Sequence, residues 1–282
     1  MVRLSEGEAR ALTLGPGSVS WRRASDARGY LAAGYALLLQ VMHPTVGSGV
    51  RDHSNFTAEP WQRLLRTLDY VNLTVYSGHR AIEVTGRLRA EHAHIKGTNP
   101  DGSRYHALEP AAFAWVQATL VHAVVNFHER FGSPLSEREK ELIYAEWLGL
   151  GRLVGVRPGD LPDDWAGFGA YFDDMIEATL EHTETADVVL ASLAHPKRPP
   201  GLPPWTEPLW RLAWAPAGHL LTLCTVGLLP PVLRERLGMT WTPWRERQLR
   251  AVSAFSRSLT PVLPRWLRVS GPGYLKLRKL AA

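Results

Sequence analysis

His92 is the histidine whose neighbours most favour a buried ligand. On a helix over residues 81–96, it shares a face with three apolar side chains at i−8, i−4 and i+3: Val84, Leu88 and Ile95. By the same count His94 faces solvent. A neutral imidazole on a rigid helix can offer one ring nitrogen to a metal ion while a hydrogen bond holds the other. A core-facing histidine can equally be an ordinary hydrogen-bonded core residue, so both interpretations stay open.

A second group of polar side chains lies upstream at helical spacing. Arg63, Thr67 and Tyr70 stand at i, i+4 and i+7, so a guanidinium, a hydroxyl and a phenol line one helical face. Polar groups on a buried face need partners. Either Arg63 and His92 satisfy each other's polar needs in a helical protein without a cofactor, or both serve a bound group.

Five sequence blocks in a fixed order connect these regions with a known family. The blocks are Gln40-Val41-Met42-His43-Pro44, Gly49-Val50 with His53-Ser54, Arg63-Leu64 with Thr67, Arg87 to Gly97 around His92, and Tyr105 to Leu120 around Trp115. Two later segments, Leu161 to Tyr171 and Leu233 to Gly238, continue the pattern. Together they resemble the domain shared by latex-clearing proteins (rubber oxygenases) and the membrane-bound oxygenase of mycophenolic acid biosynthesis. The similarity runs from about Asp26 to about Thr242.

This resemblance implies an all-α fold with a globin-like helical core and additional helices. It also implies a b-type haem with His92 as the axial iron ligand, and a haem site that needs Arg63 and Thr67. Arg63 would pair with a propionate or shape the opposite side of the pocket with Thr67. The chain has no Cys-x-x-Cys-His motif, so a haem would be bound non-covalently.

Arg66 departs from the pattern of the rubber oxygenases. A lysine next to the threonine can bind the resting iron in those relatives, because an amine can lose its proton. An arginine offers no free lone pair at accessible pH. We therefore predict a resting iron that is five-coordinate or water-bound, with Arg66 beside the reaction site but not on the metal.

The resemblance implies a haem b-dependent oxygenase that uses dioxygen to oxidise or cleave an apolar alkene, isoprenoid or lipid-like in character. An alternative is a haem-binding carrier or sensor without turnover. Oxygen consumption coupled to loss of an alkene would separate the two.

Composition narrows the partners and the compartment. The 282 residues carry a net charge of +5, and no nucleic-acid motif accompanies the basic residues, so a membrane surface is the better candidate for an acidic partner. A single cysteine, Cys224, excludes an internal disulfide and a cysteine-built metal site. The first 17 residues lack the pattern of a signal peptide. We expect a cytoplasmic protein, with peripheral membrane association as the alternative.

The sequence predicts a leader over residues 1–25 and one all-α domain over 26–282, with a linker-like stretch at 197–204 rich in proline. Helices are predicted over 30–42 with Asp26 as cap, from Pro60 to Val75, over 81–96 closed by Gly97, from Pro110 to Phe131, after the Ser136/Glu139 capping box, over 162–181 and over 242–258.

Several other segments have alternative interpretations. His43 and His53 bracket a predicted glycine turn, either holding it or standing at the mouth of a cofactor pocket. His122 and His128 lie off the apolar stripe of their helix and are interpreted as structural. The run 212–233 contains no charged residue, which fits a spanning helix, a half-buried or interfacial helix, or a buried one. The basic tail 276–279 is expected to be solvated.

Overall fold

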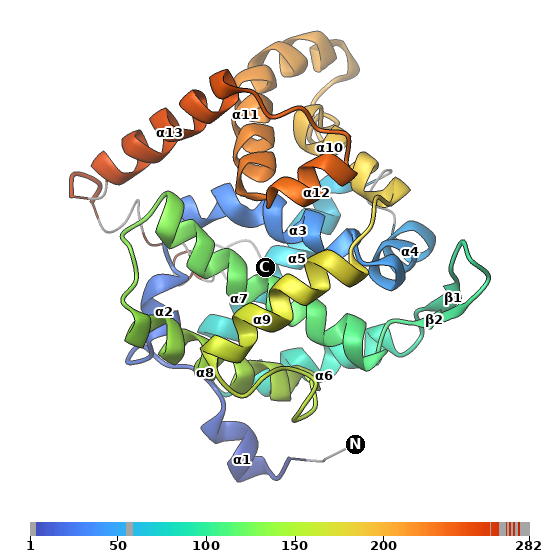
Figure 1. Ribbon diagram of the computed structural model, residues 1–282, viewed down its shortest axis with the longest axis vertical. Helices are drawn as coiled ribbons and strands as arrows, with labels where there is room; N and C mark the ends of the chain where they lie inside the picture. Colours follow the sequence, from blue (N-terminus) through green and yellow to red (C-terminus); the bar gives the residue numbers. More distant parts are fainter. Residues whose placement is uncertain are drawn as a thin grey trace.

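The computed structural model describes residues 4–54, 59–259 and 261–264, together with Val269, Gly271, Gly273 and Lys276. Helices dominate these residues, as predicted, and the only sheet among them is a two-stranded hairpin (Figure 1). The first half contains α1 (Glu6–Ala11), α2 (Val19–Arg23), the 3-10 helix η1 (Ala27–Ala32), α3 (Ala33–Val41), α4 (Pro44–His53), α5 (Pro60–Tyr76), α6 (Arg80–His92), β1 (Lys96–Thr98) and β2 (Arg104–His106). The second half contains α7 (Pro110–Arg130), α8 (Glu137–Val154), α9 (Trp165–Asp174), the π-helical turn η2 (Met175–Thr179), α10 (Glu184–Ala194), η3 (Pro204–Thr206), α11 (Glu207–Leu228), α12 (Pro231–Arg236) and α13 (Pro243–Ser258).

Local start signals place most of these helices. Asp26 caps η1 by accepting a hydrogen bond from the Arg28 N–H, and Thr242 caps α13 in the same way. Ser136 and Glu139 form the predicted capping box at the start of α8. The prolines that open α5 and α7 occupy the first turn, where no N–H is needed. These helix starts are confirmed.

The core is organised around α7, which runs through the middle of the molecule between α3 and α8 (Figure 1). Trp115 and Phe131 are fully buried, and the Trp115 indole donates a 2.9 Å hydrogen bond to the Leu39 carbonyl of α3. Among the described helices, α7 alone is long and apolar enough to cross a membrane, and half of its most apolar window is buried inside the protein. Burial by neighbouring helices explains that apolar composition.

Two glycine-based predictions are wrong. The predicted turn at residues 47–49 is part of α4, and Gly47 is needed there because a Cβ would lie 2.5 Å from the Val41 carbonyl oxygen. The helix predicted to close at Gly97 ends at His92, and Gly97 instead belongs to β1. A Cβ on Gly97 would lie 2.6 Å from the Tyr105 hydroxyl, so this glycine makes room for the ring of its cross-strand partner.

Two predicted helices are interrupted. The segment predicted over 30–42 divides into η1 and α3, and the one predicted over 162–181 divides into α9 and the π-turn η2. Arg236 of α12 donates to the carbonyls of Ile176, Glu177 and Leu180 around η2. Backbone acceptors freed by the change of helix type thus find a partner on a distant element.

The histidines of α7 have the structural surroundings that were predicted. His122 stacks on Phe172 with ring centroids 3.9 Å apart, and its Nδ1 lies 2.9 Å from the Tyr35 hydroxyl. Burial lowers the pKa of His122 to about 4, so the ring is neutral near pH 7. His128 faces the carbonyl oxygens of Arg23 and Ser133.

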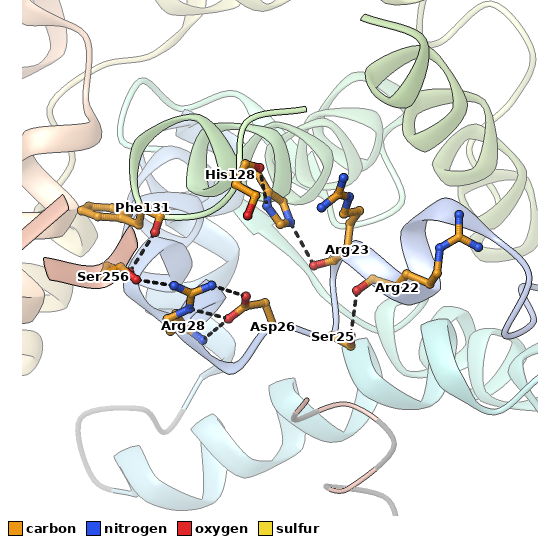
Figure 2. Close-up of polar contacts among 9 residues, drawn as sticks. Arg22, Arg23, Ser25, Asp26, Arg28, His128, Phe131 and Ser256 are labelled. Atoms are coloured by element: carbon orange, nitrogen blue, oxygen red, sulfur yellow. Dashed lines mark hydrogen bonds and ion pairs between the residues drawn. The ribbon is translucent and has the colours of Figure 1, made fainter. Parts of the chain in front are cut away.

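A polar network beside His128 fastens α13 to the core (Figure 2). Arg28 forms a nearly buried ion pair with Asp26 and donates to the Ser256 carbonyl. The Ser256 hydroxyl donates a 2.8 Å hydrogen bond to the Phe131 carbonyl at the end of α7. These contacts join η1, α7 and α13, which are far apart in sequence.

Candidate functional site

The predicted ligand His92 is the last residue of α6 and is half-buried. Its Nδ1 lies 2.8 Å from the Leu88 carbonyl oxygen. A carbonyl oxygen only accepts hydrogen bonds, so Nδ1 carries the proton and the neutral ring keeps its lone pair on Nε2. No hydrogen bond to Nε2 occurs within the described part of the chain. A fixed tautomer with one free ring nitrogen is the arrangement that a histidine ligand requires.

Apolar side chains of α7 lie beside this imidazole. The Phe113 ring packs edge-on against His92, with centroids 6.0 Å apart. Phe113 begins a stripe that continues through Val116, Leu120 and Val124, and all four are only half-buried although α7 is the core helix. Phe113 therefore supplies the apolar contact to His92, while Leu120 and Val124 farther along the stripe pack partly against the core.

The predicted polar face of α5 divides among three different partners. Arg63 donates a 3.1 Å hydrogen bond to the Ser54 hydroxyl at the end of α4. Thr67 donates to the Arg63 carbonyl at 3.0 Å, within its own helix. The Tyr70 hydroxyl donates to Glu91 and so ties α5 to α6 one residue before His92. Arg63 and His92 do not satisfy each other, which removes the contact expected in a protein without a cofactor.

Residues 62–67 of α5, which precede Tyr70 in the helix, are all exposed. Arg63, Arg66 and Thr67 are exposed, and the exposed fractions of Leu64 and Leu65 are 46% and 44%. A helix that carries two cations and two leucines in the open has a surface that the described residues leave uncovered.

The electrostatics of this helix favour an anion. Desolvation by the surrounding protein, with a smaller contribution from the like charge of Arg66, lowers the pKa of Arg63. Neither arginine has a carboxylate partner in the described ranges. Burial and the hydrogen bond to Glu91 raise the pKa of Tyr70 to about 12, so the phenol stays protonated and keeps its bond.

The first turn of α5 ends against α11 and the predicted linker. The Trp61 ring lies edge-on to Trp210 and Trp214, with centroid distances of 5.8 and 6.2 Å, and its Nε1 donates to the Lys197 carbonyl. An open cleft of about 350 Å³ lies here between the start of α5 and residues 197–200. Thus α5 reaches from the surroundings of His92 to the C-terminal helices.

His43 and His53 both lie at the ends of α4. His43 is buried, its Nδ1 has no hydrogen-bond partner among the described residues, and burial lowers its pKa to about 4. The Nε2 of His53 lies 3.0 Å from the Lys96 carbonyl. His53 thus connects α4 to the hairpin instead of holding a glycine turn.

Residue spacing alone did not identify Ser54, Glu91 and Phe113 as members of the site. Glu91 could have been found, because only three residues, Ser77 to His79, connect α5 to α6, and so short a connection makes the helices antiparallel neighbours. Ser54 meets Arg63, nine residues away, across the segment that joins α4 to α5. Phe113 meets His92 through the packing of α7 on α6, and the spacing along one helix predicts neither contact.

Together, the fold and these contacts give a mostly helical protein in which the half-buried His92 has an apolar ring of α7 beside it, and in which Arg63 and Arg66 have no carboxylate partner among the described residues. The chain belongs to the family described as ER-bound oxygenase mpaB/B'/Rubber oxygenase, catalytic domain, whose model matches residues 21–258. No curated protein and no solved structure matches the chain. Family membership makes an oxygenase domain the class of the protein.

Proposed function

We propose that the protein is a haem b-dependent oxygenase that acts on an apolar, isoprenoid or lipid-like alkene. The observation that carries the proposal is the imidazole of His92, whose proton is held on Nδ1 by the Leu88 carbonyl while Nε2 stays free. Membership in an oxygenase family supports the reaction class.

The donor set fits a haem better than a bare metal ion. The described residues contain no group of three or more His, Cys, Asp or Glu side chains that could hold a metal ion. One histidine is sufficient when a porphyrin supplies the four equatorial ligands. A haem also carries two propionates, and Arg63 and Arg66 are cations without carboxylate partners in the part of the chain that is described.

Each residue then has a definite task. His92 would hold the iron through Nε2, and Arg63 would bind a propionate or, with Thr67, shape the pocket on the α5 side. Phe113 and the α7 stripe would exclude water and hold an apolar substrate. A bound ferrous haem supplies the chemistry of dioxygen, the second substrate. Arg66, a cation without a lone pair, would add positive charge near the reacting groups.

The first test is the visible absorption of the purified protein supplied with haemin. We expect an intense Soret band in the wild type that is lost or strongly shifted in His92→Ala. His94→Ala is the matched control, because it removes an exposed imidazole two residues away. A wild-type protein that stays colourless, or a His92→Ala spectrum equal to that of the control, would overturn the assignment of the ligand.

A second measurement separates the oxygenase from a haem-binding carrier or sensor. The haem-loaded protein is given dioxygen and a polyisoprenoid alkene, and both are followed with time. Oxygen uptake coupled to loss of the alkene supports the oxygenase. A stable spectrum with no uptake would support the carrier.

A further inference from the structure

The two parts of the chain differ strongly in charge. Residues 1–196 contain 18 Lys and Arg against 24 Asp and Glu, a net charge of −6, whereas residues 197–282 contain 14 against three, a net charge of +11. The modest overall charge therefore conceals a basic C-terminal third. A segment with this balance attracts an acidic surface.

The most exposed apolar side chains lie in the same third. Among the described residues, six large apolar side chains are 60% exposed or more: Trp205, Leu209, Leu212, Trp244, Phe255 and Val262. Scattered exposed apolar residues are normal, but the largest exposed patches mark surfaces that bind other molecules. The coincidence of apolar exposure and basic charge needs one explanation.

Helix α11 shows how this surface arises. Its residues 209, 212, 216, 220 and 223 follow one helical face. Leu223 is buried, Leu220 packs partly against the core, and Leu212 is 74% exposed. The face that packs on the core in the second half of α11 thus continues beyond the core in the first half. The uncharged run 212–233, predicted as one helix, is divided between α11, which ends at Leu228, and α12, which begins at Pro231. Its α11 part is half-buried, which is one of the three predicted forms.

Helix α13 adds aromatic and basic groups next to α11. Gln248 of α13 lies 3.4 Å from His219 of α11, and Figure 1 shows both helices together at the end of the molecule opposite α1. The Arg247 guanidinium lies over the exposed Trp244 ring, 5.4 Å from its centroid. Tryptophan beside arginine is typical of the boundary between lipid headgroups and acyl chains.

We propose that the first half of α11 and the outer face of α13 form a docking surface for an anionic lipid membrane. Basic side chains would contact the headgroups while Trp205, Leu209 and Leu212 enter the boundary of the acyl chains. The exposed aliphatic side chains favour lipid over nucleic acid, because leucine cannot stack on a base. The docking surface shares no residue with the proposed haem site.

The test is cosedimentation of the full chain with vesicles of phosphatidylcholine, with and without phosphatidylglycerol, at low and high salt. We expect binding to the anionic vesicles that weakens with salt. Leu209→Gln with Leu212→Gln should weaken it roughly tenfold or more, because both leucines lose apolar burial. Arg247→Gln should weaken it on the order of fivefold. Leu142→Gln and Arg138→Gln on exposed positions of α8 are the matched controls and should bind like the wild type.

Absence of binding to anionic vesicles, or equal loss in the α8 controls, overturns the proposal. So does a dimer in solution that the double leucine variant dissociates, because a second copy of the chain would then cover this surface. The Soret band of each variant with haemin is recorded in parallel. A preserved band with lost membrane binding keeps a failure of the docking surface distinct from a failure of the haem site.

Discussion

Arg63→Gln gives the sharpest test of the α5 side of the site, because the structure predicts a small loss of folding stability and a large loss of cofactor affinity. The side chain is exposed, and its hydrogen bond to the Ser54 hydroxyl is 3.1 Å long. Loss of one exposed hydrogen bond changes the free energy of unfolding by about 0.5 kcal/mol. For a chain of this size we therefore expect a fall in Tm of only about 1–2 °C.

The expected effect on haem is much larger. A hydrogen bond from a guanidinium to a carboxylate contributes about 1.5–3 kcal/mol, which corresponds to roughly tenfold to hundredfold in affinity. Glutamine keeps much of the side-chain length but removes the charge.

Haemin titration followed by the Soret band measures the affinity, and thermal unfolding followed by circular dichroism measures the stability. Arg87→Gln is the matched control: Arg87 is an exposed arginine on α6 that is already paired with Glu83 at i,i+4. Equal haem affinities in the two variants would refute the propionate role of Arg63. A fall in Tm of more than about 5 °C in Arg63→Gln would show that Arg63 contributes more to the stability of the fold than one exposed hydrogen bond does.

Two further predictions concern one residue each. Arg66→Lys should convert the resting spectrum of the haem-loaded protein to that of a strong-field nitrogen ligand, whereas the wild type and Arg66→Ala should both lack it; a wild-type signal that disappears in Arg66→Ala would contradict this. Hydrogen bonds from Ser136, and after them the hydrogen bond and ion pair with Arg23, lower the pKa of Glu139 to about 2. The ionised carboxylate therefore stabilises the fold fully above its ordinary pKa of 4.5, and this stabilisation is lost as the pH falls toward 2. Glu139→Gln should cost about 2–3 kcal/mol at pH 7, and urea titrations should show the difference from wild type shrinking between pH 5 and pH 3; a constant difference over that range would refute the assignment.

The sequence predicted helix starts well because the interactions that make them are local. A cap such as Asp26 or Thr242 bonds within the next three residues, and the Ser136/Glu139 capping box is complete within one turn. The sequence blocks also identified the family to which the chain belongs, because each block is a local sequence pattern. The globin-like arrangement of the core and the roles of Arg63, Arg66, Thr67 and His92 stay predictions.

Helix ends and glycines were harder, since distant residues decide them. A glycine at position 97 could either cap a helix or leave room for a neighbouring ring. The Tyr105 side chain across the hairpin shows that it leaves room for a ring. Gly47 is selected in the same way by the Val41 carbonyl. The tie between Tyr70 and Glu91 also depends on how two helices pack. Spacing along one helix cannot contain such contacts.

Helix α5 connects the two surfaces for which we propose functions, and the chemistry of the proposed substrate gives a reason. A long-chain alkene is nearly insoluble in water and collects in membranes, so an enzyme that oxidises it gains by taking it directly from lipid. The first turn of α5 contacts the tryptophans of α11 beside the proposed docking surface, while Tyr70 ties its later part to α6 beside His92. Between these contacts, Leu64 and Leu65 are exposed. An apolar chain that leaves the membrane at α11 would therefore meet Leu64 and Leu65 of α5 before it reached the imidazole.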